Sequence, residues 1–138
     1  YAERLLRLPL TGETGLLARR VGLLSPLYET VAQAAVAQTP DEAFAFAIAR
    51  GQTALPPPGA DLTRSAVAAA FADPAPAHSY AWFVQSDRMG EALLRAALIL
   101  SDPGHDPGDI TDALALLRQV GLEDLARRTA LQLLILRG

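Results

Sequence analysis

Hydrophobic residues in this chain recur mainly at intervals of three and four positions, the spacing of a helix with one buried stripe. The pattern is clearest near the C-terminus, where two such stretches, 109–120 and 122–136, are separated by Gly121. A glycine directly after a helix often adopts the left-handed conformation that ends it. We therefore predict an αα-hairpin with its turn at Gly121 and with Asp109 as the N-cap of its first helix.

Start and stop signals divide the rest of the chain into further short helices. The clearest start is Thr39-Pro40-Asp41-Glu42, which has the pattern of a capping box with proline in the first helical position. We expect the Thr39 hydroxyl to accept from the Glu42 amide and the Glu42 side chain to reach back to the Thr39 amide. The helix that begins here ends at Arg50-Gly51. The other predicted helices span 2–8, 15–24, 27–38, 62–72, 77–85 and 87–100.

The predicted helix 87–100 is hydrophobic on nearly every side, because only Arg88, Glu91 and Arg95 mark a solvent-facing side. Glu91 and Arg95 have the spacing of a favourable ion pair along a helix. A helix that is apolar on nearly every side is normally enclosed by its neighbours, so we predict that it is central or sandwiched between other helices. The helix 122–136 has a main apolar stripe that includes Leu125 and Leu133, and it also carries Leu131 and Ile135 beyond that stripe. We expect the rest of the domain, a second subunit or a neighbouring segment to cover them.

These elements predict an all-α fold in which residues 1–138 form a single domain of about eight short helices. The helices are expected to pack as an irregular array of αα-hairpins, either a compact bundle or a short α-solenoid. We find no self-similar period, and the residue pattern of tetratricopeptide repeats is absent. The sequence is therefore assigned to no family.

Composition agrees with helices and indicates an origin. The chain is 51% hydrophobic but only 6% aromatic, and alanine and leucine, both strong helix formers, predominate. It has no Cys, Lys or Asn, so disulfides and thiolate chemistry are excluded. The absence of Lys and Asn indicates a GC-rich bacterial genome, with a lysine-free engineered chain as the alternative. The chain lacks an initiator Met and begins inside a predicted helix, so we expect it to be excised from a longer protein.

Charge and hydropathy exclude two classes of partner. The net charge is −3 and the pI about 5.3, and no dense cluster of arginines provides the basic face of a nucleic-acid-binding protein. No apolar run approaches the ~20 residues that a membrane span requires. We expect a soluble protein of the bacterial cytoplasm or periplasm, and the sequence does not decide between them.

Two segments contain residue types that can carry chemistry. Asp102, His105, Asp106 and Asp109 lie within eight residues, but they lack the carboxylate spacing and the closing Glu of a calcium loop. We interpret 102–109 as a doubled Asp-Pro-Gly turn and predict no metal and no cofactor. The adjacent pair His78-Ser79 points in two directions, so the histidine is poorly placed to activate the serine. No catalytic residue is assigned.

Aromatic residues and an arginine gather within the segment 80–88, and these residue types anchor many protein interfaces. They are as common in cores, so both locations remain open. The candidate partner-binding residues are Tyr80, Trp82, Phe83, Arg88, Leu131 and Ile135.

Three functions fit these observations. The first is a non-enzymatic helical scaffold or protein–protein interaction module of a bacterial protein, whose partner is another protein, the rest of its parent chain or a second copy. The alternative is an all-α pocket that binds an apolar small molecule or lipid. The third is an accessory domain of an enzyme whose catalytic part is absent from this sequence and lies in the rest of the longer protein.

Overall fold

The structure is a computed structural model that describes residues 4, 7–72, 78–102, 104 and 106–136. This part of the chain is all-helical and contains no strand, which confirms the predicted fold class. The predicted helix 2–8 falls largely outside the described residues. The α-helices of the structure are α2 (Gly12–Leu23), α3 (Tyr28–Ala34), α4 (Pro40–Ala49), α5 (Leu62–Ala70), α6 (Ala81–Gln85), α7 (Met89–Ser101), α8 (Pro107–Gln119) and α9 (Glu123–Leu136). A 3-10 turn at His78–Tyr80 precedes α6. None of the helices described is both long enough and apolar enough to cross a membrane.

The start of α4 follows the predicted capping signal in part. The Thr39 hydroxyl accepts a hydrogen bond from the Glu42 amide at 3.1 Å, and Pro40 occupies the first turn. The Glu42 side chain does not complete the capping box. Its carboxylate instead binds Arg19 of α2, with Nε–Oε2 and Nη2–Oε1 distances of 2.5 and 3.0 Å. A bidentate bond to a guanidinium is stronger than one to a backbone amide, which explains the difference.

The start of α8 corrects a second prediction. Asp106, and not Asp109, is the N-cap residue, and its Oδ1 accepts from the Gly108 amide at 2.7 Å. Pro107 begins the helix, because the first position of a helix needs no amide donor. The turn after α8 agrees with the prediction: Gly121 has φ +87°, and the Leu122 amide donates to the Leu117 carbonyl at 2.8 Å.

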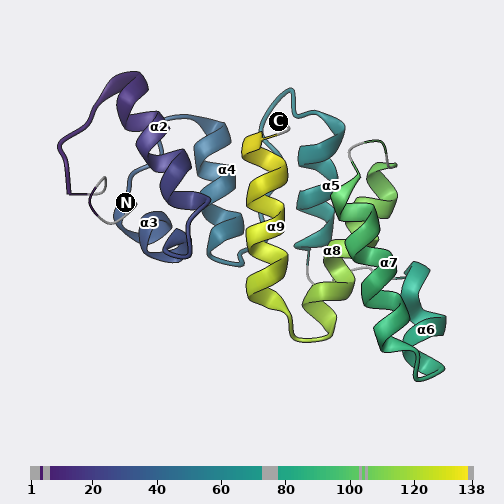
Figure 1. Ribbon diagram of the computed structural model, residues 1–138. Helices are drawn as coiled ribbons and strands as arrows, with labels where there is room; N and C mark the ends of the chain where they lie inside the picture. Colours follow the sequence, from purple (N-terminus) through teal and green to yellow (C-terminus); the bar gives the residue numbers. More distant parts are fainter. Residues whose placement is uncertain (1–3, 5–6, 73–77, 103, 105, 137–138) are drawn as a thin grey trace.

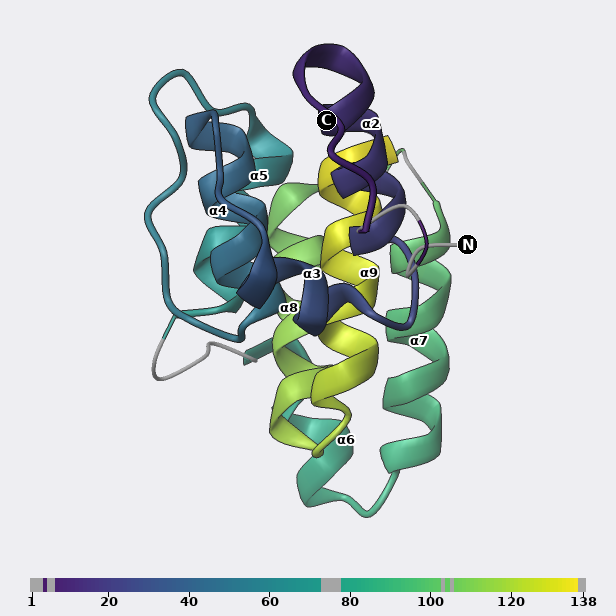
Figure 2. The ribbon, with the colours of Figure 1, turned by 90° about the vertical axis from the view of Figure 1, so that its left-hand side faces the viewer.

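The helices pack compactly with α8 at the centre (Figures 1 and 2). On α8 lie α5, α7 and α9; α9 in turn packs on α4, α3 packs on α4, and α2 packs on α3. The 3-10 turn contacts α8, and α6 packs on α7 at the opposite end of the molecule from α2. Helices α4 and α9 are therefore neighbours although they are distant in sequence.

The buried residues form two clusters that share α8. The larger cluster contains Ile48 of α4, Val67 of α5 and Leu114 of α8, each 0% exposed. The smaller cluster consists of Tyr80, Ala92, Ala96, Ala113 and Leu116. Because fully burying a Leu or Ile contributes about 1.5–3 kcal/mol by transfer, the larger cluster holds most of the packing energy.

The predicted central position of the 87–100 helix is wrong. Helix α7 lies at the edge of the packed helices, with only Ala92 and Ala96 buried, while Leu94 and Leu98 are each 63% exposed. The enclosed helix is α8, of which six residues are buried. The apolar arc of α7 is as wide as its sequence indicates, but neighbouring helices cover only part of it.

The C-terminal helix does lie between neighbours. It packs on α8 and α4, and Leu131 is 0% exposed while Ile135 packs against the larger cluster. The rest of the domain covers the extra apolar side that the sequence showed. The stripe is not buried evenly, since Leu125 is 49% exposed.

Candidate functional site

An open apolar groove of about 570 Å³ runs between α7 and α9. Its origin is the packing of α7 on α8 through alanines: Ala92 and Ala96 are fully buried and let the two helices approach closely. Helix α9 lies on α8 at another side, so a channel remains between α7 and α9. The groove is lined by Leu93, Ala97, Leu100 and Ser101 of α7, Leu117 of α8, and Leu122, Leu125, Thr129 and Gln132 of α9 and the turn before it.

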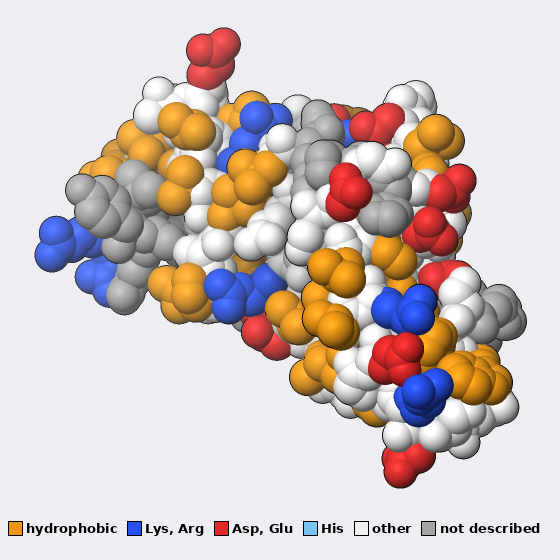
Figure 3. Space-filling model, turned by 45° about the vertical axis from the view of Figure 1, so that its right-hand side comes forward, with side chains coloured by type: hydrophobic (Ala, Val, Ile, Leu, Met, Phe, Trp, Pro, Cys, Tyr) orange, Lys and Arg blue, Asp and Glu red, His pale blue; other side chains and the backbone are white. Residues whose placement is uncertain are grey.

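Exposed leucines extend this apolar surface beyond the groove. Leu94 and Leu98 follow the groove-lining side of α7 around the helix, since successive residues are 100° apart. On the opposite wall, Leu122 and Leu125 are 39% and 49% exposed. Figure 3 shows hydrophobic side chains gathered on this face of the molecule, next to a group of charged ones. We call the groove together with Leu94 and Leu98 the α7–α9 surface.

A charged border limits the α7–α9 surface on the outer side of α7. Glu91 forms ion pairs with Arg88 and Arg95, both at 3.3 Å, and the second is the predicted pair. The arginines also cover aromatic rings: Arg88 lies 5.5 Å from the centre of the Trp82 ring, and Arg95 lies 5.0 Å from that of Phe83. The border therefore carries both signs of charge, and its side chains are held in place.

The structure separates the predicted partner-binding residues into interior and surface positions. Tyr80 is 4% exposed and Leu131 0%, so both pack inside the chain. Phe83 and Ile135 are partly buried against the clusters. Trp82, 56% exposed, and Arg88 lie on the surface of α6 and at the start of α7. These six residues do not form one site.

Sequence reasoning did not assign the leucines of the α7–α9 surface to a site. A signal was present, because the sequence of this helix has one apolar stripe that includes Leu93, Ala97 and Leu100, and Leu94 and Leu98 lie on a different side. That signal was interpreted as evidence for a central helix. Only the tertiary arrangement shows that this side has no neighbour in the described part of the chain.

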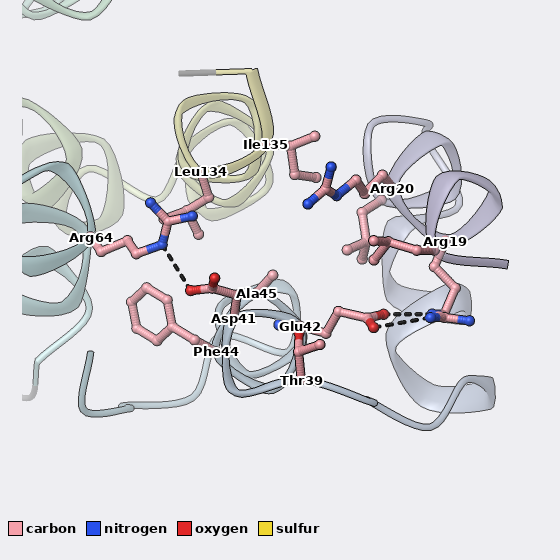
Figure 4. Close-up of a pocket in the computed structure, with 12 residues that line it drawn as sticks. Arg19, Arg20, Thr39, Asp41, Glu42, Phe44, Ala45, Arg64, Leu134 and Ile135 are labelled. Carbon is pink, nitrogen blue, oxygen red and sulfur yellow. Dashed lines mark hydrogen bonds and ion pairs between the residues drawn. The ribbon is translucent and has the colours of Figure 1, made fainter. Parts of the chain in front are cut away.

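A second pocket, of about 220 Å³, lies among α2, α4, α5 and α9 (Figure 4). Here Arg64 pairs with Asp41 at 3.0 Å, and Arg19 pairs with Glu42, which is 7% exposed. The hydrogen bonds that Arg19 donates to the Glu42 carboxylate raise the pKa of Arg19. Because these charges neutralise each other between helices, we assign this pocket a structural role.

The 102–109 segment gives no metal site within the part that is described. The Asp102 and Asp106 carboxylates accept from the Gly104 and Gly108 amides at 2.9 and 2.7 Å, as expected for two turns. No group of three potential ligands occurs among the described residues. His105 lies outside them, so the absence of a metal stays a prediction.

The His78-Ser79 pair can be followed only in part. The Ser79 hydroxyl donates to Asp112 of α8, and the side chain of His78 is not among those described.

The comparisons with known proteins add no relationship: no family model matches the sequence, no curated protein is similar to it, and no solved structure matches its fold.

Proposed function

We propose that this protein is a non-enzymatic interaction module that binds an amphipathic helix of a partner protein on the α7–α9 surface. The observation that carries the proposal is the 63% exposure of Leu94 and Leu98 beside an open apolar groove. Contiguous exposed apolar patches are uncommon on monomeric proteins, and where they occur they often mark interaction surfaces. The arginine-only set of basic residues supports a bacterial origin for the chain.

The dimensions of the groove favour a helix as the occupant. Its walls are helices of 13 and 14 residues, each about 20 Å long at 1.5 Å per residue. A partner helix of three to four turns has about the same length. Such a helix places residues i, i+3, i+4 and i+7 in an apolar groove.

The border of the groove also suits a protein ligand. Ser101, Thr129 and Gln132 supply hydrogen-bonding groups along an otherwise apolar lining. Charged residues of both signs stand at the outer side of α7. An apolar centre with a polar rim is the common anatomy of protein interfaces. The exposed Trp82, stabilised by Arg88, lies next to this rim and is of a type that often anchors partners.

An apolar small molecule or lipid is the second candidate, because 570 Å³ lies within the size range of small-molecule pockets. Such pockets normally enclose 70–90% of the ligand surface, whereas this groove is open along its length. The open form is the reason for preferring the helix.

The test uses a displayed library of amphipathic peptides of about 14 residues, the length that matches the groove. Dissociation constants of selected peptides are measured by fluorescence anisotropy against the protein and three variants. We expect Leu94→Ser and Leu98→Ser each to weaken binding at least tenfold, as for a central interface residue. Leu62→Ser is the matched control, since Leu62 is a helical leucine that is 71% exposed on α5, and it should leave binding unchanged.

Any one of four results would overturn the proposal. The first is that selection yields no binder. The second is that the selected peptides bind the Leu94 and Leu98 variants as well as they bind the unchanged protein. The third is that dodecanoate binds in the groove while peptides do not, which would favour the lipid pocket. The fourth is that light scattering finds a dimer that Leu94→Ser converts to a monomer, which would make a second copy of the chain the occupant.

A further inference from the structure

A third pocket, of about 440 Å³, lies on the other side of α7 and shares only Leu98 with the α7–α9 surface. It is bounded by the 3-10 turn, α6, α7 and the first turns of α8. Phe83, Leu98 and Ile99 form its apolar wall, and Ser79, Tyr80, Arg95, Asp109 and Asp112 supply its polar atoms. Two carboxylates and a tyrosine hydroxyl therefore face an apolar wall across one small space.

Tyr80 is the most unusual member of this pocket. The residue is 4% exposed, yet its hydroxyl has no hydrogen-bond partner among the described residues. Buried tyrosine hydroxyls usually find a partner. No fully buried side-chain oxygen or nitrogen in the described part of the chain lacks one, so this hydroxyl must open onto the pocket. It can therefore accept from, or donate to, a bound group.

The charges around Tyr80 determine what that group can be. Asp112 accepts from Ser79 and forms no ion pair with the described residues, so its negative charge is not neutralised there. Burial raises the pKa of Tyr80, and the nearby Asp109 and Asp112 carboxylates raise it further. Among the described residues that line the pocket, the positive group is Arg95, which is held by Glu91 at 3.3 Å and lies over the Phe83 ring. The field inside the pocket favours a cation.

We propose that this pocket binds an alkylammonium group. The ammonium would donate to the Asp112 carboxylate and the Tyr80 hydroxyl, and its alkyl chain would lie against Phe83, Leu98 and Ile99. A primary ammonium has three donors and no acceptor, which matches a site that offers mainly acceptors. Hydrogen bonds to an ionised group are also about twice as strong as neutral ones. The group could belong to a free amine or to the lysine side chain of a protein.

The experiment is a titration of the ¹⁵N-labelled protein with n-hexylammonium chloride, followed by amide chemical shifts. We expect saturable shifts at residues 79–83, 95–99 and 109–112, and a much weaker response to the neutral analogue 1-hexanol. Asp112→Asn keeps the side-chain shape and should raise the dissociation constant at least about tenfold, because the neutral amide cannot form the charge-assisted hydrogen bond to the ammonium. Tyr80→Phe keeps the buried ring and should weaken binding severalfold.

Asp87→Asn is the control, because it removes the same charge from the nearby α6–α7 turn outside the pocket. It should leave the affinity unchanged. A parallel titration with Nα-acetyl-lysine methylamide distinguishes the sources: tighter binding of this compound indicates a protein side chain, and tighter binding of hexylammonium indicates a free amine. The proposal is overturned if neither compound gives saturable shifts, or if Asp112→Asn and Asp87→Asn behave alike.

Discussion

Thr39 and Thr11 hold the same position before their helices, and only Thr39 uses its side chain as a cap. Both have extended backbone angles, but the Thr11 hydroxyl makes no capping bond, whereas that of Thr39 accepts from the Glu42 amide. Thr39→Ala should therefore lower the free energy of unfolding by about 1 kcal/mol, the usual contribution of an N-cap. Thr11→Ala should change it little. Urea unfolding of both variants measures the difference, and equal losses would contradict the assignment.

Tyr28 links α3 to the start of α9 and should make stability depend on pH in the alkaline range. It is 2% exposed, and its hydroxyl donates to Asp124 Oδ1 at 2.6 Å. Burial, reinforced by the bond to Asp124, raises its pKa from 10.0 to about 12. The folded state then keeps a proton that the unfolded state releases, so the stabilisation is present below pH 10 and is lost as pH rises toward 12.

The predicted loss is up to about 1.4 kcal/mol for each pH unit between those two pKa values. Urea unfolding from neutral to alkaline pH measures it in the protein and in Tyr28→Phe. The variant should be less stable at neutral pH by about 1–3 kcal/mol, because Asp124 loses its donor. Its stability should then fall less steeply above pH 10. Parallel curves for the two proteins would show that Tyr28 titrates normally.

At the scale of elements, the approach of α2 to α3 depends on a glycine. A Cβ added at Gly22 would lie 2.8 Å from Val31 Cγ2, and Val31 is 0% exposed and β-branched. Gly22→Ala should therefore destabilise the protein by about 1–3 kcal/mol through overpacking. Gly90→Ala in α7 is the matched control. Nothing lies within 4 Å of its added Cβ, so it should stabilise by about 0.4–1 kcal/mol. Thermal melts that shift in the same direction would refute this.

The burial of α9 gives a prediction on which leucines hold it in place. Leu131 is 0% exposed within the larger cluster, while Leu125 is 49% exposed at the groove. Leu131→Ala should cost about 2–5 kcal/mol, including the cavity that it leaves. Leu125→Ala should cost much less. Urea unfolding distinguishes this result from the sequence-based expectation, in which Leu125 belonged to the buried stripe.

The helices could be predicted from sequence because their signals are local. Caps and spacing identified α4 and the α8–α9 hairpin, including the turn at Gly121. The environment of α7 could not be predicted in this way. Periodicity measures the width of an apolar face, but the number of helices that cover it depends on long-range packing. The start of α8 was misplaced because Asp106 and Asp109 are both good N-caps, and Pro107 decides between them.

The two surfaces assigned here were less predictable than the helices. The aromatic group at 80–83 was noticed, but its sequence left core and surface positions open. The structure places Tyr80 inside and Trp82 outside. The pairing of Ser79 with Asp112 joins residues 33 positions apart. No local sequence pattern encodes such a contact. The pocket between the 3-10 turn and α8 could therefore be found only from the folded structure.

At the scale of the whole molecule, α8 connects the two buried clusters. Its Ala113 and Leu116 belong to the smaller cluster, whereas Leu114 and Leu117 belong to the larger one. Adjacent sides of one helix thus support both ends of the molecule. Loss of α8 would expose apolar surface in both clusters at once, and this shared dependence favours unfolding as a single unit.

That expectation can be tested because the only tryptophan reports on one end. Trp82 lies in α6, beside Phe83 at a ring-centre distance of 5.0 Å, far from α2 and α3 (Figure 1). Its fluorescence follows the smaller cluster, while far-UV circular dichroism follows all helices. We expect the two urea unfolding curves to coincide. Leu116→Ala, at a fully buried position of α8, should shift both midpoints equally and lower stability by about 2–5 kcal/mol. A Trp82 transition at lower urea than the loss of helix would show that α6 and α7 unfold separately, and the chain would then contain two units of unfolding.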